Sequence, residues 1–382
     1  MSTASTNDSS GAVPEKMRAV LLTGYGGLDK LVYRENLPTP RPGFGEVLVK
    51  VGACGVNNTD VNLRTRWYDR DVNTSLSEEV GLRGTQGPAR TDEETAASWK
   101  EETIRFPRIQ GAAIAGRIVA VGGSVEEGRV GQRVIVDPQI RDVNLPLRAQ
   151  LVAYLGGERD GGFAEYVAVP AGNAHAVEIP LSDAELATFP TSYDTAEEML
   201  ERTRLSTGET IVITGAAGGV GTALIQLARI RGARVVAIAG ASKKERLLSI
   251  GAHELVSRDA SNVREGVMAF VGPQGTDVVA DVVGGAIFGD LLKMLRRGGR
   301  YATAGAIAGP IQSMDLRELI YKDLEMYGIT SPSPATFARV VAKVTAGRLR
   351  PLLQRSFPLK DLQLAQAEFV KRTHVGKFAI IP

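Results

Sequence analysis

A glycine-rich turn between an apolar strand and an amphipathic helix constrains this chain more than any other feature. The turn reads Thr214-Gly215-Ala216-Ala217-Gly218-Gly219-Val220-Gly221. It follows Thr210–Ile213, a predicted strand, and opens Val220–Ile230, whose apolar spacing predicts a helix that stops at Gly232. A helix that begins after such a turn offers free N–H groups and the positive end of its dipole to an anion. The turn therefore predicts a phosphate-binding site.

Individual residues of the turn have separate expected roles in holding a dinucleotide. Gly218 lets the backbone approach the pyrophosphate, and Gly221 lets the helix pack closely on the sheet. Ala216 stands where the usual pattern has its first glycine. We expect the cofactor to contact Ala216, Gly218, Gly219, Val220 and Gly221. A glycine-rich turn without a ligand is the alternative, and the strands and helices around the turn argue against it.

After the turn the chain continues to alternate strands and helices. Strands are predicted at Arg234–Ala239, Asp277–Val283 and Arg300–Ala304, and a helix at Lys243–Ile250. This alternation predicts an α/β fold with a doubly wound parallel sheet and helices on both of its faces.

The residues after the second strand decide which nicotinamide dinucleotide fits. NAD sites usually place an acidic residue about 20 residues beyond the glycine motif, where it binds the ribose 2′-hydroxyl. Here the stretch Gly240-Ala241-Ser242-Lys243-Lys244 has no acid. A hydroxyl and two ammonium groups suit a 2′-phosphate, so we predict NADPH, with Gly240, Ser242 and Lys243 at its site. A solvated helix start is the alternative, but cations there oppose the helix dipole.

The two ends of the chain have a different pattern. From Arg18 to about Val169, short apolar runs punctuated by glycine and proline predict mainly β structure. The polar stretch from Arg66 to Pro107 is too long for an ordinary loop, so we expect a lid, an arm or a small helical insert. Residues 1–16 are expected to be a disordered leader. The C-terminal predictions are a helix at Ala335–Ala346, a short segment at Phe357–Leu359, a helix at Leu362–Lys371 and a strand at Lys377–Ile380 that rejoins the first domain.

Composition excludes several classes of function. The length of 382 residues suits two domains. A net charge of +2 gives no broad basic field and argues against nucleic acid as a partner. No apolar run approaches the roughly 18 residues of a membrane span, so no membrane contact and a cytoplasmic location are expected. The single cysteine, Cys54, cannot form an intramolecular disulfide, and we expect it to be a small buried apolar residue.

Several motifs make the chain similar to the medium-chain dehydrogenase/reductase superfamily from Met17 to Pro382. These motifs are Gly45–Lys50, Gly55–Asp60, Gly131–Val134, Gly161–Tyr166 and the Ala216–Gly221 turn. The resemblance implies a GroES-like, mainly β catalytic domain formed by residues 17–181 and 333–382. It implies a Rossmann domain at residues 182–332, a small-molecule substrate, and a homodimer or homotetramer.

Zinc alcohol dehydrogenases of this superfamily hold a catalytic metal, but the matching positions here differ. Asn57, Thr191 and the segment Gly111-Ala112-Ala113 stand at those positions. Amide, methyl and hydroxyl groups are not zinc ligands, so we expect no metal site. The resemblance is then to the zinc-free quinone oxidoreductases and the NADPH-dependent enone or double-bond reductases. Without a Lewis acid, an alkoxide is hard to stabilise, whereas hydride addition to a quinone or an activated alkene needs only hydrogen bonds and a proton.

The same resemblance suggests roles for individual residues. The candidate catalytic residues are Asn57, Thr59 and Tyr68, and the further cofactor contacts are Asn58 at the pyrophosphate, Thr195 at the nicotinamide amide, Gly305 and Lys377. Asn57 and Tyr68 are donors for the developing charge, although Tyr68 could equally be a lid contact. Asn62 stands where a second pocket tyrosine is often found.

Other polar residues are expected to be structural. Asp60 is expected to brace the loop around Asn57, and Arg64 to pair with Asp60 or to face the cofactor. The histidines are expected on the surface or in loops, with no ligand group near them; they are His175, His253 and His374.

The sequence predicts an NADPH-dependent, zinc-independent oxidoreductase that transfers hydride to a quinone or an α,β-unsaturated carbonyl. Two alternatives stay open. One is an alcohol dehydrogenase-type carbonyl or alcohol oxidoreductase. The other is a non-catalytic protein that retains NADPH.

Overall fold

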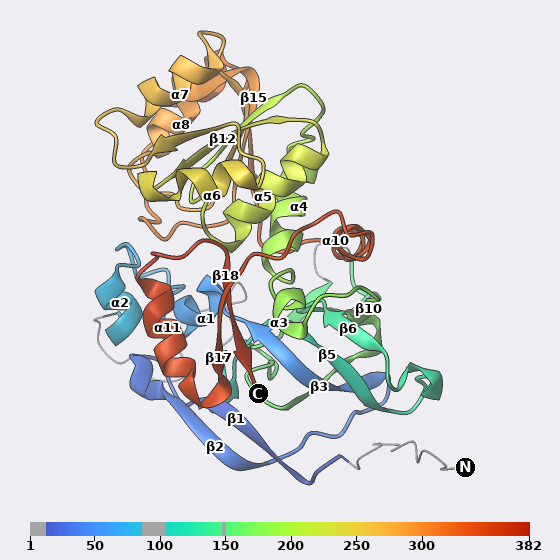
Figure 1. Ribbon diagram of the computed structural model, residues 1–382. Helices are drawn as coiled ribbons and strands as arrows, with labels where there is room; N and C mark the ends of the chain where they lie inside the picture. The colour runs from blue at the N-terminus through green and yellow to red at the C-terminus, as the bar shows by residue number, and fades with distance from the viewer. Residues whose placement is uncertain (1–12, 86–103, 147–149) are drawn as a thin grey trace.

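The computed structural model describes residues 13–85, 104–146 and 150–382, which form two lobes (Figure 1). The upper lobe in Figure 1 contains a parallel sheet, and the lower lobe contains strands from both ends of the chain. Residues 1–12 of the predicted leader lie outside the described residues, and Lys16 already belongs to the first strand. Residues 86–103 of the predicted insert also lie outside them, whereas Glu78–Arg83 forms a short helix, α2.

The lower lobe is organised around the long strand β3, Glu46–Gly55. This strand pairs antiparallel with β5 (Ala113–Val121) and with β18 (Lys377–Ile381), which itself runs parallel to β17 (Leu353–Pro358). The last residues of the chain therefore return to the lower lobe. The other strands of this lobe are β1 (Lys16–Leu22), β2 (Leu31–Pro38), β4 (Arg108–Ile109), β6 (Arg133–Val136), β7 (Gln139–Arg141), β8 (Leu151–Tyr154), β9 (Tyr166–Pro170) and β10 (Ala174–Ala176).

The upper lobe contains a six-stranded sheet in the order β13-β12-β11-β14-β15-β16. Its strands are β11 (Thr210–Ile213), β12 (Arg234–Ala239), β13 (Glu254–Ser257), β14 (Thr276–Asp281), β15 (Leu295–Thr303) and β16 (Glu325–Gly328). Every pair of neighbours in it is parallel, which confirms the predicted doubly wound sheet. The strand order reverses at β11, and the carboxyl ends of strands at such a switch point are where these sheets bind ligands.

Helices cover both faces of the parallel sheet. Besides α2, the helices are α1 (Asn58–Arg64), α3 (Asp183–Leu186), α4 (Ser192–Arg202), α5 (Gly219–Ile230), α6 (Lys244–Ser249), α7 (Val263–Val271), α8 (Phe288–Met294), α9 (Leu316–Tyr321), α10 (Pro334–Thr345) and α11 (Leu362–Val370). Side chains of a strand point alternately to its two faces. Ile211 and Ile213 thus join the core that contains Leu224 of α5, whereas Val212 packs with Leu291 of α8 on the opposite face.

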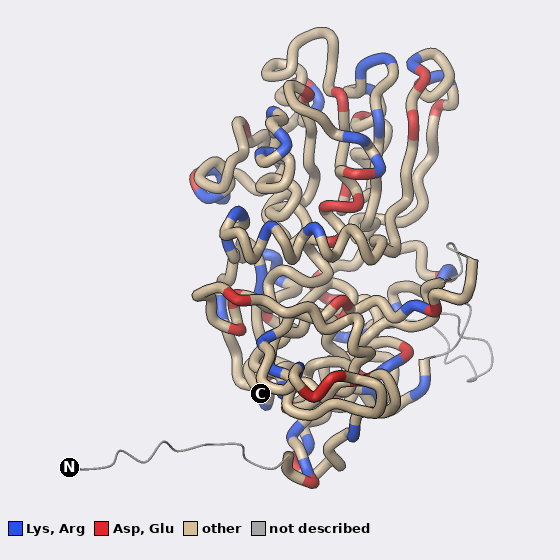
Figure 2. The backbone as a smooth tube through the Cα atoms, turned by 90° about the vertical axis from the view of Figure 1, so that its right-hand side faces the viewer, with Lys and Arg blue, Asp and Glu red and all other residues tan. Residues whose placement is uncertain are grey.

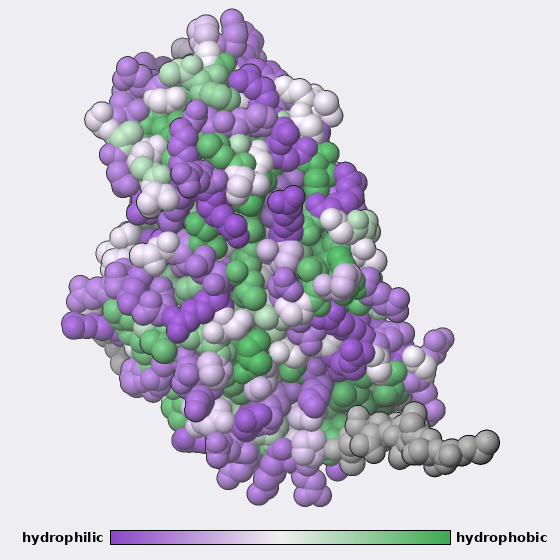
Figure 3. Space-filling view, viewed as in Figure 1, coloured by the Kyte–Doolittle hydropathy of each residue, from purple (hydrophilic) through white to green (hydrophobic). Residues whose placement is uncertain are grey.

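The surface carries charges of both signs. Figure 2 shows Lys and Arg interspersed with Asp and Glu along the backbone of both lobes. Figure 3 shows that polar side chains interrupt the apolar ones on the face it presents. Among the described residues, none of the helices combines the length and the apolar character that a membrane crossing requires.

Candidate functional site

The glycine-rich turn connects β11 to α5 and leaves an open space above its backbone. A Cβ on Gly221 would lie 2.4 Å from the carbonyl oxygen of Gly215, so the close packing of α5 on the turn requires glycine there. A Cβ on Gly218 would have its nearest neighbour at 3.5 Å, an ordinary contact. Gly218 therefore has room for a ligand beside it, and Gly221 fixes the helix behind it.

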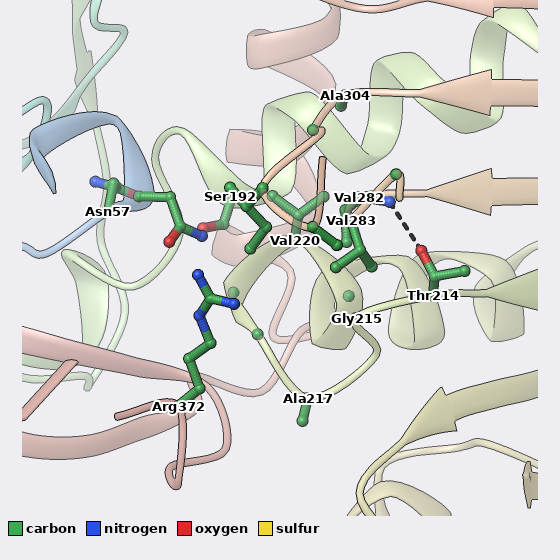
Figure 4. Close-up of a pocket in the computed structure, with 18 of the residues that line it drawn as sticks. Asn57, Ser192, Thr214, Gly215, Ala217, Val220, Val282, Val283, Ala304 and Arg372 are labelled. Carbon is green, nitrogen blue, oxygen red and sulfur yellow. Dashed lines mark hydrogen bonds between the residues drawn. The ribbon is translucent and has the colours of Figure 1, made fainter. Parts of the chain in front are cut away.

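A buried carboxylate anchors this turn to the neighbouring strand. Thr214 Oγ1 donates a hydrogen bond to Asp281 Oδ1 at 2.5 Å and accepts one from the backbone N of Val282 at 3.0 Å (Figure 4). Tyr301 Oη donates to the other carboxylate oxygen of Asp281 at 2.7 Å. Asp281 is fully buried at the carboxyl end of β14. These bonds hold the turn at the switch point of the sheet.

A cavity of about 450 Å³ extends from the turn across to α1 and the C-terminal segment. Most of the predicted site residues line it, namely Asn57, Asn58, Thr59, Tyr68, Thr195, Gly218, Gly219, Val220, Gly221, Gly240, Lys243, Gly305 and Lys377. Two predicted cofactor contacts do not line it. Ala216 is fully buried in the core, and Ser242 is exposed on the 3₁₀ turn that precedes α6. The structure thus brings both predicted groups of residues to one cavity.

Three cationic residues, Lys243, Arg258 and Arg372, line the cavity, and the Arg372 guanidinium donates to the carbonyl oxygen of Leu76. Lys243 Nζ donates to the carbonyl oxygen of Arg372 at 2.7 Å, and Arg258 lines the same wall. Figure 4 shows Arg372 reaching into the pocket from the C-terminal segment. Burial lowers the pKa of Lys243 and of Arg372, and the positive charge of Arg258 lowers both further. The sequence predicts only Lys243 of these three residues, because Arg258 and Arg372 come to the cavity from more distant parts of the chain.

Asn57 forms the amino-terminal cap of α1 at the opposite end of the cavity. Its backbone N donates to Asp60 Oδ2 at 2.8 Å, so Asp60 braces this loop as expected. The Asn57 side chain has protein partners at both ends. Its Nδ2 donates to the carbonyl oxygen of Gly55 at 3.1 Å, and its Oδ1 accepts from Lys377 Nζ. The amide therefore holds Lys377 in position.

Lys377 is a buried ammonium group at the base of the cavity. Only 3 % of the residue is exposed, and its Nζ donates to Asn57 Oδ1 and, at 3.2 Å, to Ser192 Oγ. Burial lowers the pKa of Lys377 to about 8, against the opposing effects of Asp60, Cys54 and Asp194. The two acids are also buried, and burial raises the pKa of each to about 7. The site therefore contains a cation whose charge is only partly compensated.

A second cavity, of about 390 Å³, adjoins the first. Thr59, Tyr68, Thr191, Thr195 and Ala304 line both cavities. Thr59 Oγ1 is buried and has no hydrogen-bond partner among the described residues. Tyr68 is 37 % exposed, and burial of its hydroxyl raises the pKa to about 12, so the group remains a proton donor at neutral pH.

Sequence reasoning missed two residues of the second cavity, Tyr154 and Asp194. Tyr154 Oη and Thr191 Oγ1 lie 3.3 Å apart on its wall. Asp194 is 1 % exposed, and its Oδ1 has no hydrogen-bond partner among the described residues. Neither residue belongs to a motif, and only the folded chain brings them beside Thr59.

The predicted placement of Arg64 is wrong. Arg64 neither pairs with Asp60 nor faces the cavity. It is fully buried and donates to Gln366 Oε1 and to the carbonyl oxygens of Gly26 and Gly81. His374 lies in a loop, as predicted, and its ring stacks on Phe369 and lines the main cavity.

The other two histidines and the cysteine do not line the main cavity. His175 lies in β10, a strand and not a loop, and its partly exposed ring is 5.0 Å from that of Phe337. His253 accepts the backbone N–H of Val235 through Nδ1. Cys54 is a free, fully buried thiol, as expected.

The side chains at the positions of a family metal site do not fit zinc. Asn57, Ala112, Ala113 and Thr191 supply neither a thiolate, an imidazole nor a carboxylate. Within residues 13–85, 104–146 and 150–382, no group of three or more His, Cys, Asp and Glu side chains could hold a metal ion.

Family comparisons agree with this two-part site. Residues 43–180 match the family model described as alcohol dehydrogenase GroES-like domain. Residues 219–346 match the model described as zinc-binding dehydrogenase. The first range contains Asn57, Thr59 and Tyr68, and the second begins within the glycine-rich turn.

Individual proteins are similar over nearly the whole chain. A solved structure from Sinorhizobium meliloti 1021, provisionally assigned as an alcohol dehydrogenase, is 46% identical with a TM-score of 0.85, over 97% of this chain and 98% of that one. The quinone oxidoreductase of Homo sapiens is 25% identical over 93% of this chain and 94% of its own length. The chloroplastic NADPH-dependent alkenal/one oxidoreductase of Arabidopsis thaliana is 24% identical over 97% of this chain and 81% of its own.

Proposed function

The chain belongs to the medium-chain dehydrogenase/reductase superfamily, and from that premise we propose that it is an NADPH-dependent reductase of quinones or α,β-unsaturated carbonyl compounds. Membership makes it an oxidoreductase of a family that uses a nicotinamide cofactor. The observation that carries the proposal is a single cavity that joins a phosphate-binding turn and three cations to Thr59 and Tyr68. Such a cavity can hold a dinucleotide at one end and a substrate at the other.

The choice of NADPH over NADH is supported by the charge at the cavity end. Lys243, Arg258 and Arg372 line the same cavity as Gly218, so we expect them to face the ribose of the adenosine half when the pyrophosphate lies at Gly218. A 2′-phosphate would compensate their mutual repulsion, whereas a 2′-hydroxyl would not. The described residues place no acid in the lining of this cavity to bind a ribose hydroxyl pair.

The residues around the second cavity support reduction of an activated double bond. A bound reduced nicotinamide supplies the hydride. Tyr68 remains protonated at neutral pH and can donate a hydrogen bond or a proton at the substrate oxygen. Thr59 Oγ1 has no hydrogen-bond partner in the described part of the chain, so it can bind the substrate or a water molecule. Carbonyl reduction would produce an alkoxide, which a site with these donors stabilises less readily than an enolate or a hydroquinone anion.

A panel of acceptors tests this function. NADPH oxidation is followed with quinones, enones, and aldehydes, and NADP⁺ reduction with alcohols, on protein whose zinc content has been measured. We expect turnover with quinones or enones, no stoichiometric zinc, and no effect of a chelator. Turnover of alcohols that a chelator abolishes would support the alternative favoured by the name of the Sinorhizobium meliloti relative. Tight NADPH binding without any turnover would support a non-catalytic role.

A further inference from the structure

The surroundings of Lys377 leave its charge available to a ligand. Its partners within the described residues, Asn57 Oδ1 and Ser192 Oγ, are both neutral. An ammonium has three N–H donors, and these two bonds use two of them. A buried cation without a directly paired carboxylate is costly, which makes an anion at this point favourable.

The ammonium also lies among the positions where the family has a metal site. Its first partner, Asn57, stands at one of these positions. Its second partner, Ser192, directly follows Thr191, which stands at another. The third position, at Ala113, is also close to Lys377. A Cβ on Gly55 would lie 3.3 Å from Lys377 Cε and 3.2 Å from Ala113 Cβ. The end of Lys377 thus contacts Asn57 and lies close to two further positions of the family's metal site.

The path of the side chain separates its ammonium from the phosphate-binding turn. A Cβ on Gly219, in the first turn of α5, would lie 2.8 Å from Lys377 Cδ and 3.4 Å from its Cγ. The methylene stem therefore passes the helix terminus, and Nζ extends beyond it to Asn57. The charge is thus directed toward the substrate end of the cavity.

We propose that the Lys377 ammonium occupies the position of the family's metal ion and stabilises the negative charge that develops on the substrate oxygen. This proposal rests on the reductase function above. With an enone, hydride adds to the β-carbon, the alkene electron pair moves toward the carbonyl, and the oxygen takes the charge. The free N–H of Lys377 binds that oxygen and keeps its proton. A solvent-derived proton then adds to the α-carbon and restores the carbonyl group.

Neutral substitutions of Lys377 in the full-length enzyme test the proposal. In Lys377→Met, loss of a preorganised donor should lower kcat by about 10²–10³, while the Kd of NADPH should remain within about three-fold. Lys377→Arg should retain more activity than the neutral variants, and added methylammonium should partly restore Lys377→Ala. Lys360→Met, an exposed lysine of the same C-terminal segment, is the control and should behave like the parent. If Lys377→Met does not fold, Lys377→Gln takes its place.

Other results would overturn the proposal. A loss of NADPH affinity of about ten-fold or more with kcat unchanged would show that the ammonium binds the cofactor pyrophosphate. Zinc bound stoichiometrically at the site would exclude a substituting ammonium.

A binding measurement separates the inference from the reductase function. para-Nitrophenol added to the NADP⁺ complex should bind as the coloured phenolate in the parent and lose that form in Lys377→Met. If the parent reduces no acceptor, the reductase function fails, and this spectrum still decides whether Lys377 binds an oxyanion. Binding of the neutral phenol, or no binding, would refute the role of Lys377.

Discussion

Lys243 and Lys244 follow one another in the chain, but their ammonium groups have different surroundings. Lys243 lines the cavity beside Arg372, whereas Lys244 pairs with Glu254 at 2.7 Å outside it. A charge-assisted contact contributes about 1.5–3 kcal/mol. We therefore predict that Lys243→Ala weakens NADPH binding by about ten-fold or more and hardly changes NADH binding. Fluorescence titration measures both, with Lys244→Ala as the matched control. Equal weakening of the two cofactors would show that Lys243 does not recognise the 2′-phosphate.

The pH dependence of turnover should report the charge of Lys377. Its pKa is lowered to about 8 by burial, so the ammonium is charged below that pH and neutral above it. Turnover should accordingly fall as the pH rises through about 8. Of the groups that face it, burial raises the pKa of Asp60 and Asp194 to about 7 and lowers that of His374 to about 4. The thiol of Cys54 has its pKa raised well above the ordinary value.

A profile of kcat against pH for the parent and Lys377→Arg checks this assignment. Because a guanidinium stays protonated throughout this range, the variant should lack the decline near pH 8. A decline that persists unchanged in Lys377→Arg would belong to another group.

At the scale of elements, two glycines of the turn have different roles: Gly221 allows α5 to pack closely, whereas Gly218 leaves room for a ligand. Gly218→Ala places a methyl group in ordinary van der Waals contact with Gly215 at a φ of −76°, which any residue adopts. We predict an unchanged melting temperature but weaker binding of both NADPH and NADH, because the methyl group would occupy the pyrophosphate position. Gly221→Ala should instead lower the melting temperature, since its Cβ would lie 2.4 Å from a backbone oxygen. Thermal unfolding and cofactor titration measure these effects. Unchanged affinity in Gly218→Ala would place the pyrophosphate elsewhere.

The regular elements of the upper lobe could be predicted, because their signals are local. The strands Thr210–Ile213 and Arg234–Ala239 have the predicted bounds, and α5 begins one residue before its prediction. The predicted helix Lys243–Ile250 is α6, shortened by a 3₁₀ turn at its start. Local spacing and glycine positions sufficed for these elements.

The rest of the site depends on contacts between distant parts of the chain. Arg372 joins Lys243, and Lys377 joins Asn57, only after the C-terminal segment has returned to β3. Asp281 carries no motif that would link it to Thr214. Such pairings follow from the fold and have no periodic signal in the sequence.

At the scale of the whole molecule, exposed apolar side chains lie in the segment that leads into the edge strand β16 of the parallel sheet. β16 is the last strand in the sheet order, and the preceding segment exposes Ile311, Ile320 and Tyr321 by 70%, 62% and 71%. Unpaired strand edges and exposed apolar patches favour association. We predict that the chain is a homo-oligomer through this edge and that Ile320→Glu dissociates it. Light scattering after size-exclusion chromatography measures the mass, with Leu364→Glu, 49% exposed on α11, as the control. A monomeric parent would contradict this assembly.

The position of a transferred deuterium atom tests the central claim most directly. The parent enzyme is given NADPH deuterated at the transferable position and an enone that offers both a C=C and a C=O bond. Because the site is proposed to stabilise an enolate, mass spectrometry and NMR should find deuterium on the β-carbon of a saturated ketone. Deuterium on the carbonyl carbon of an allylic alcohol would contradict this account and would identify a carbonyl reductase instead.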